Sequence, residues 1–211
     1  MMKTVSAFLA IGVFGCLPFR ANAMLVEGIA VSDANKQGAL KESMRKLWAD
    51  HVIWTREFIV AELGSSPEAD DVAGRLLKNQ ADIGESFVPF YGKEAGETLA
   101  ALLKQHILIA AEVVDAAKDG DNRKFKDSSK RWHDNAAEIA VFLSGVNPLL
   151  SKNALLGMFD DHLALTTRET VARIDKNWVE DIATFDDLFG KMMLMADDIS
   201  GGIIKQFPDK F

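Results

Sequence analysis

Three windows of the chain repeat one pattern around a histidine: "LWADHVIWT" at 47–55, "LLKQHILIA" at 102–110 and "MFDDHLALT" at 158–166. In each window an apolar pair comes first, an Asp or Gln directly precedes the histidine, and an aliphatic residue follows it. The histidines, His51, His106 and His162, lie 55 and 56 residues apart. Since chance rarely gives three such windows at near-equal spacing, they predict a threefold internal repeat.

A second, shorter motif follows each window: "NQADIG" at 79–84, "NAAEIA" at 135–140 and "MADDIS" at 195–200. All three contain an acidic residue, an isoleucine and a small residue in succession, whereas Asn79 and Asn135 have no counterpart at Met195. We therefore expect three homologous helical hairpins of about 56 residues, with approximate bounds 40–92, 93–148 and 149–211.

Almost the whole chain after residue 35 has the apolar periodicity of α-helices, and no segment alternates polar and apolar residues as a strand does. Turn-forming residues stand where connections are expected: Gly120 ends one helix, and Ser66 and Ser151 are candidate N-caps. These patterns predict an all-α fold, a six-helix bundle built from three hairpins packed side by side.

The three histidines are predicted to point into this bundle. The residues three positions after them share their helix face and are apolar, as a buried face requires: Trp54, Ile109 and Leu165. A helix rises about 1.5 Å per residue, so residues can be placed along the bundle axis by counting from the hairpin turn. By this count, a carboxylate and an asparagine of the second helix lie within roughly 5 Å of the histidine's level along that axis. These are Asp82 with Asn79 in the first hairpin, and Glu138 with Asn135 in the second.

The N-terminal segment has the features of a secretory signal peptide. Lys3 supplies a basic start, an apolar run follows, and "ANA" precedes a cleavage point after Ala23. This predicts a signal peptide at 1–23, a single helical domain at 24–211, and a periplasmic or extracellular location. The alternative is a lipoprotein anchored through Cys16, although Phe14 fits that pattern poorly.

Composition excludes some partners. The 211 residues carry a formal net charge of −7, and loss of the predicted signal makes it −9. An acidic chain without a basic cluster argues against nucleic acid and against anionic membrane surfaces as partners. The only cysteine lies in the signal, so the exported domain depends on its apolar core rather than on disulfides. No segment of the mature chain has the length and hydropathy of a transmembrane helix.

The segments "HVIWTREFI", "RLLKNQADIG", "PFYGKEAG", "LLKQHILIAAE", "WHDNAAEIAVFLS" and "GIIKQFP" resemble a family of uncharacterised, often exported bacterial helical proteins. The resemblance covers most of residues 47–211. It implies one coherent helical fold and no established activity.

Two interpretations of the inward histidines remain open. In the first, each imidazole forms a hydrogen bond with the Asn or carboxylate of its own hairpin, because a buried ring nitrogen is costly without a partner. In the second, His51, His106 and His162 together hold zinc, copper or iron, with Asp82 or Glu138 as a further ligand. The Glu-x-x-His spacing of carboxylate-bridged bundles is absent before all three.

Other residues carry weaker signals. Arg56 could pair with an inward carboxylate or bind an anionic ligand, and Arg173 could do the same, but ordinary surface salt bridges are the favoured interpretation for both. His133 does not fit the repeat and is expected near the surface. No phosphate-binding loop, nucleophile elbow or cysteine nucleophile occurs in the mature chain, so nothing declares a reaction and enzymatic activity stays undecided.

The pattern favours an exported binding protein whose interior contains histidines and carboxylates that hold a metal ion or a small ligand. The competing hypothesis is a structural or protein-interaction module in which the polar interior only fixes helix register. Repetition of the histidine in all three units favours the binding protein.

Overall fold

The computed structural model describes residues 33–211, which contain six α-helices, one short 3-10 helix and no strand. The helices are α1 (Asp33–Leu63), α2 (Ala69–Tyr91), α3 (Lys93–Lys118), α4 (Asn122–Val146), α5 (Lys152–Ile174) and α6 (Trp178–Gln206), followed by η1 (Pro208–Lys210). The all-α prediction is confirmed for this part of the chain. The predicted signal peptide, its cleavage after Ala23 and the alternative lipidation of Cys16 lie outside the described residues.

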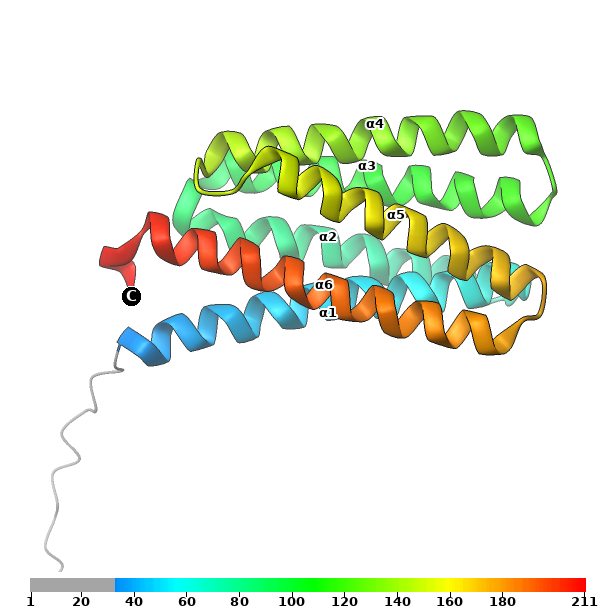
Figure 1. Ribbon diagram of the computed structural model, residues 1–211, viewed down its shortest axis with the longest axis horizontal. Helices are drawn as coiled ribbons and strands as arrows, with labels where there is room; N and C mark the ends of the chain where they lie inside the picture. Colours follow the sequence, from blue (N-terminus) through cyan, green and yellow to red (C-terminus); the bar gives the residue numbers. More distant parts are fainter. Residues whose placement is uncertain (1–32) are drawn as a thin grey trace, which may run out of the picture. The chain divides into compact units, whose positions relative to one another are not determined.

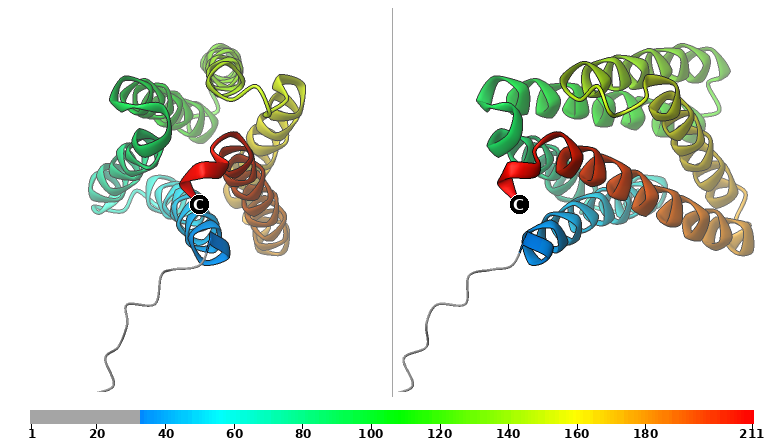
Figure 2. Two further views of the ribbon diagram at one scale, coloured as in Figure 1. Left: turned by 90° about the vertical axis from the view of Figure 1, so that its left-hand side faces the viewer. Right: turned by 60° about the vertical axis from the view of Figure 1, so that its left-hand side comes forward.

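The helices are long and run side by side (Figure 1). Viewed end on, they follow one another around a ring in chain order, each packs against the next, and α6 closes the ring against α1 (Figure 2). In addition, α1, α3 and α5 contact one another across the ring. The three helices that contain the repeated histidine windows therefore lie closest to the centre.

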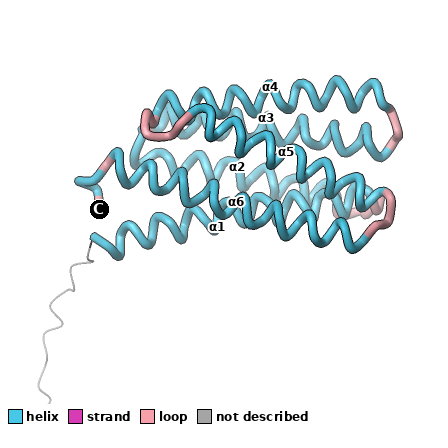
Figure 3. The backbone as a smooth tube through the Cα atoms, in the orientation of Figure 1, coloured by secondary structure: helices cyan, strands magenta, loops and turns pink. Residues whose placement is uncertain are grey.

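Three turns at one end of the bundle share a backbone conformation (Figure 3). Their central residues, Ser65, Gly120 and Lys176, have positive φ angles of 52°, 67° and 57°. In each turn the next residue donates its N–H to a carbonyl five positions earlier, at 2.8–3.0 Å, which is a left-handed helix C-cap of the Schellman type. Each left-handed residue follows its histidine by 14 positions, so the caps place the three histidines at one height.

The opposite end contains the closest helix–helix approach. Gly92, with φ 84°, is the only residue between α2 and α3. A Cβ atom on Gly84 would lie 2.5 Å from the carbonyl oxygen of Gly96, so neither position has room for a side chain. This contact joins the first predicted hairpin tightly to the second.

Helix starts only partly follow the predictions. Ser151 caps α5, because its hydroxyl accepts the N–H of Ala154 at 3.4 Å. The N-cap prediction for Ser66 is wrong: α2 begins at Ala69, and the N–H of Ser66 is used in the turn that closes α1. The turn after α1 thus takes priority over a cap for α2.

The apolar core runs along the whole bundle between these ends. Trp48, Phe87, Trp132 and Phe159 are its largest side chains and are at most 2% exposed. Burial of such side chains contributes about 1.5–3 kcal/mol each, which is enough to stabilise a domain without disulfides. Within residues 33–211, no helix is both long enough and apolar enough to cross a membrane.

A buried histidine cluster as candidate site

Three histidine side chains meet in the centre of the bundle. His51 comes from α1, His106 from α3 and His162 from α5, and none is more than 3% exposed. The ring centre of His162 lies 5.6 Å from that of His51 and 5.9 Å from that of His106. We call these three residues the histidine cluster, in which His162 contacts both of the others.

His106 is held by a side chain of its own hairpin. Its Nδ1 lies 2.8 Å from Asn135 Oδ1, and Asn135 Nδ2 donates to the carbonyl of Leu102 at 3.2 Å. Since the amide nitrogen is the donor to Leu102, Oδ1 accepts the Nδ1–H of His106. The remaining nitrogen, Nε2, therefore carries a lone pair, and it is buried without a hydrogen-bond partner among the described residues.

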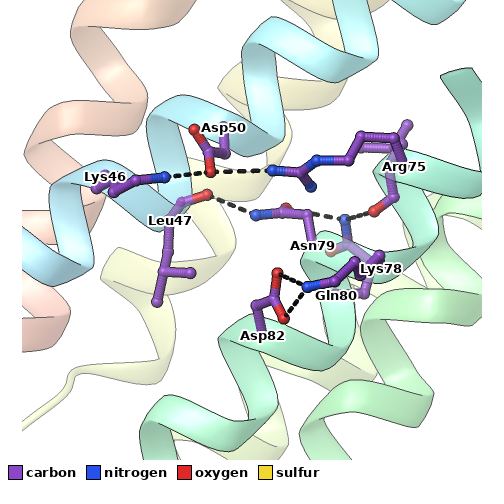
Figure 4. A network of polar contacts seen from close by, with 9 residues as sticks. Lys46, Leu47, Asp50, Arg75, Lys78, Asn79, Gln80 and Asp82 are labelled. Atoms are coloured by element: carbon purple, nitrogen blue, oxygen red, sulfur yellow. Dashed lines mark hydrogen bonds and ion pairs between the residues drawn. The ribbon is translucent and has the colours of Figure 1, made fainter.

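His51 has a weaker attachment. Its Nδ1 lies 3.3 Å from Gln80 Nε2, which is also 2.9 Å from the carbonyl of Leu76 and 3.1 Å from Asn79 Oδ1. An amide nitrogen has two hydrogens for these three acceptors, so the longest contact, to His51, is the weakest. Asn79 Nδ2 donates to the carbonyl of Leu47 at 3.0 Å (Figure 4), as Asn135 does to Leu102.

His162 has no such attachment. Its Nδ1 is buried and has no hydrogen-bond partner in the described chain. The third hairpin has Met195 where the first two have asparagine, so the side chain that would hold the ring is missing. An unsatisfied buried polar atom costs about 1–3 kcal/mol, which makes His162 the least stabilised member of the histidine cluster.

Two tryptophans flank the histidine cluster. The Trp48 ring centre lies 5.6 Å from that of His51, and the Trp132 ring centre lies 5.3 Å from that of His106. Both indole Nε1–H groups are buried without a hydrogen-bond partner in residues 33–211, as is Gln80 Oε1. Unsatisfied donors and acceptors thus gather around one point, where most protein interiors have few.

Burial keeps the three imidazoles neutral at pH 7. It lowers the pKa of His51 to about 3 and that of His106 to about 4, and it lowers the pKa of His162 well below the ordinary value. Repulsion between the rings acts in the same direction for His51 and His162. Neutral imidazole has one donor nitrogen and one acceptor nitrogen, and its acceptor lone pair is what coordinates a metal.

The metal prediction is not confirmed. In the part of the chain that the structure describes, no three His, Cys, Asp or Glu side chains form a group arranged to hold a metal ion. The three histidines are brought together, but the predicted carboxylate ligands do not reach them.

The predictions that Asp82 and Glu138 face the histidines are wrong. Asp82 lies at the bundle surface, where Lys78 binds both of its carboxylate oxygens at 2.8 and 2.9 Å (Figure 4). Glu138 is exposed. Each acid lies three positions after an inward asparagine, which leaves it turned by about 60° from the asparagine, and in both hairpins this turn brings it to the solvent-facing edge of the helix.

Arg56 belongs to a second buried cluster, between α1, α5 and α6. Its Nη1 bonds to Glu169 and lies 2.8 Å from Asp181 Oδ1, and Arg173 Nη1 lies 2.9 Å from Asp181 Oδ2. Glu169 and Asp181 are 1% and 2% exposed. We call these four residues the charged cluster. Arg56 thus pairs with inward carboxylates, and the favoured expectation of an ordinary surface salt bridge is wrong for this residue.

Sequence reasoning missed several of these residues. Gln80 stands in the "NQADIG" motif beside Asn79, but the second and third motifs have alanine there. Glu169 follows His162 by seven positions, which is two helical turns on the inward face, and this spacing could have identified it. His133 is exposed and lies 2.8 Å from the carbonyl of Ser129, as its position outside the repeat suggested.

No family model, curated protein or solved structure matches this chain. The family resemblance therefore stays a prediction, and any function has to be argued from the site itself.

Proposed function

We propose that this chain is a binding protein whose histidine cluster is the binding site. The observation that carries the proposal is His162, a neutral imidazole between two others whose Nδ1 is buried and unpartnered. A purely structural role accounts for His106 and His51, each of which contacts an amide of its own hairpin. It does not account for the third ring, whose burial is unfavourable until something bonds to it.

The space around the rings restricts the ligand to a single atom or ion. Ring centres 5.6 and 5.9 Å apart leave no room for an organic molecule between them. A cavity lined by Trp132, which contacts His106, and by Thr55 and Thr166 among others has a volume of about 20 Å³, which is the size of one water molecule.

A transition-metal ion such as zinc, copper or iron suits these dimensions. With metal–nitrogen bonds of about 2.0–2.1 Å, the centres of two imidazoles on one ion lie about 5–6 Å apart. The lone pair on His106 Nε2 is available for such a bond. Because the described side chains do not form a metal-holding group as they stand, binding requires the rings to turn, with His162 moving first since no hydrogen bond restrains it.

The proposed threefold repeat supports a shared site. The three equivalent C-caps place the histidines at one height, and the bonds from Asn79 to Leu47 and from Asn135 to Leu102 occupy matching positions in the first two hairpins. We infer that the hairpins descend from one ancestor and that the third lost its asparagine. With the predicted signal peptide at 1–23, the binding site belongs outside the cytoplasm.

The second candidate function is a structural or interaction module in which the polar interior fixes helix register. The chain of hydrogen bonds from His106 through Asn135 to Leu102 favours it, because buried hydrogen bonds between two helices specify how the helices align.

Metal analysis separates the two candidates. The protein is purified without chelator, its metal content is measured by elemental analysis, and zinc and copper are titrated calorimetrically into wild type, His162→Leu and His133→Leu. His133 is exposed, so its variant controls for nonspecific binding to histidine. We expect one ion per chain in wild type and in His133→Leu, with at least about tenfold weaker binding in His162→Leu. If all three proteins bind the metal equally, the histidine cluster is not a metal site, and the structural or interaction module is the remaining candidate.

A further inference from the structure

A second site lies at the end of the bundle where the three left-handed turns gather. It is a pocket of about 320 Å³ between the end of α1, the end of α3 and the turn from α5 to α6. This volume is within the usual range for sites that bind small molecules. The pocket is separate from the histidine cluster and does not depend on its function.

The pocket combines an apolar wall with cationic side chains. Its apolar part consists of Val60, Leu63, Ile174 and Trp178, and its basic part of Lys118, Arg173 and Lys176. Trp178 is 52% exposed, whereas Trp48 and Trp132 are each 2% exposed. No carboxylate is among the described residues that line the pocket.

The cations differ in how far they are already neutralised. Lys118 Nζ lies 2.7 Å from Glu62 Oε1, and Arg173 binds Asp181 through one of its nitrogens while lying 5.5 Å from the Trp178 ring centre. The side chain of Lys176 makes no hydrogen bond or ion pair with the described residues.

The net charge available to a ligand is therefore small. Lys176 contributes a whole positive charge, and the guanidinium of Arg173 retains free N–H groups beside it. One anionic group can receive hydrogen bonds from both, whereas a multiply charged ligand would meet the nearby acids.

We propose that this end pocket binds a small amphiphilic monoanion, such as an aromatic or medium-chain carboxylate or sulfonate. The apolar body lies against Trp178 and Ile174, and the anionic group lies between Arg173 and Lys176. Such a ligand uses both halves of the pocket, while an inorganic anion would leave the apolar wall uncovered and an uncharged apolar molecule would bury the cations without a partner.

The fluorescent anion 8-anilinonaphthalene-1-sulfonate tests the proposal with the folded, full chain. Titrations compare wild type with Lys176→Glu and Lys152→Glu, which make the same charge change at exposed lysines. We expect one binding site in wild type, about tenfold weaker binding in Lys176→Glu because a favourable charge becomes a repulsive one, and wild-type binding in Lys152→Glu. Trp178→Ala, a change at a half-exposed side chain, should also weaken binding and covers the case that Lys176→Glu does not fold.

Competition identifies the ligand class. Decanoate should displace the probe, whereas decyltrimethylammonium, with the same chain and the opposite charge, should not. Equal displacement by both would overturn the anionic class, and equal probe binding by Lys176→Glu and Lys152→Glu would overturn the site.

Discussion

The bundle buries two polar clusters, and they are satisfied to different degrees. In the charged cluster, two arginines meet two acidic side chains, and Arg56 and Asp181 each bond to more than one atom. Only Glu169 Oε2 is buried there without a hydrogen-bond partner among residues 33–211. In the histidine cluster, burial keeps the rings neutral and leaves nitrogens of His106 and His162 without partners.

The difference shows which buried polar atoms a core can leave without a hydrogen-bond partner. An unpaired buried charge costs several kcal/mol, and each of the four side chains of the charged cluster accordingly has an ion-pair partner. An unpaired neutral nitrogen costs about 1–3 kcal/mol, which a bundle of this size can sustain. Incomplete bonding is thus expected in the neutral cluster, and that is where a ligand can improve the bonding.

The largest effect is expected from Arg56→Met. This change leaves Glu169 and Asp181 buried with only Arg173 as counter-charge, and we expect it to lower the free energy of unfolding by about 3–5 kcal/mol. Urea denaturation measures this. Arg45→Met, which breaks the exposed pair with Asp197, is the control and should lower the free energy of unfolding far less, because solvent screens an exposed ion pair. Similar losses in the two variants would mean that the charged cluster is no more important than a surface pair.

Lowering the pH should weaken the contribution of the histidine cluster to stability and strengthen that of the charged cluster. The three histidines have folded pKa values below the ordinary 6.5, so their contribution is full above pH 6.5 and is lost as the pH falls. Burial raises the pKa of Glu169 from 4.5 to about 7, although Arg56 opposes the shift. Its contribution is therefore full below pH 4.5 and is lost as the pH rises through 7.

Between pH 7 and pH 5 these contributions oppose each other, and the histidines dominate because there are three. We expect a net loss of about 2–4 kcal/mol in the free energy of unfolding, measured by urea denaturation across this range. His162→Leu should make the pH dependence shallower and Glu169→Gln should make it steeper. A profile that neither variant alters would show that these groups do not control it.

A smaller effect distinguishes two members of the histidine cluster. His106→Leu leaves Asn135 Oδ1 buried without a donor and should cost about 1–3 kcal/mol, whereas His162→Leu breaks no hydrogen bond and should be neutral or stabilising in the presence of chelator. Urea denaturation with EDTA makes the comparison. Equal losses would indicate that His162 has an interaction within the folded chain.

The smallest effect is expected beside the charged cluster. Thr184 Oγ1 is buried without a hydrogen-bond partner in residues 33–211. Thr184→Val should therefore raise the free energy of unfolding by up to about 1 kcal/mol, which thermal denaturation can detect. A marked loss would show that the hydroxyl has a partner such as a buried water.

The helices, the three turns and the inward direction of the histidines could be predicted from sequence, because all three follow from spacing along a helix. Whether the histidines meet could not, because it depends on how the hairpins pack against one another. The predicted position along the helix axis was right for Asn135, which bonds to His106. The predicted direction around the helix axis was wrong for Asp82 and Glu138. The position of a side chain along the helix axis follows from counting residues, whereas the direction in which it points depends on how the helix is rotated against its neighbours.

The charged cluster could be predicted only in part. Arg56 was assigned a possible carboxylate partner, but its partners lie 113 and 125 positions away. Glu169 lies seven positions after His162 on the inward face, whereas nothing local distinguishes Asp181 from the many surface acids of helices. Their role arises from the packing of α5 and α6 against α1, which is a property of the tertiary fold.

The equal distance from each histidine to its left-handed turn has a consequence for how this chain can vary in length. One residue inserted anywhere in those fourteen-residue arms would rotate a ring by about 100° and raise it by about 1.5 Å, which removes it from the centre. Residues added beyond the turn, before α2, α4 or α6 begins, would leave the ring in place. Related chains should therefore differ in length after Ser65, Gly120 and Lys176, and keep the arms before them unchanged.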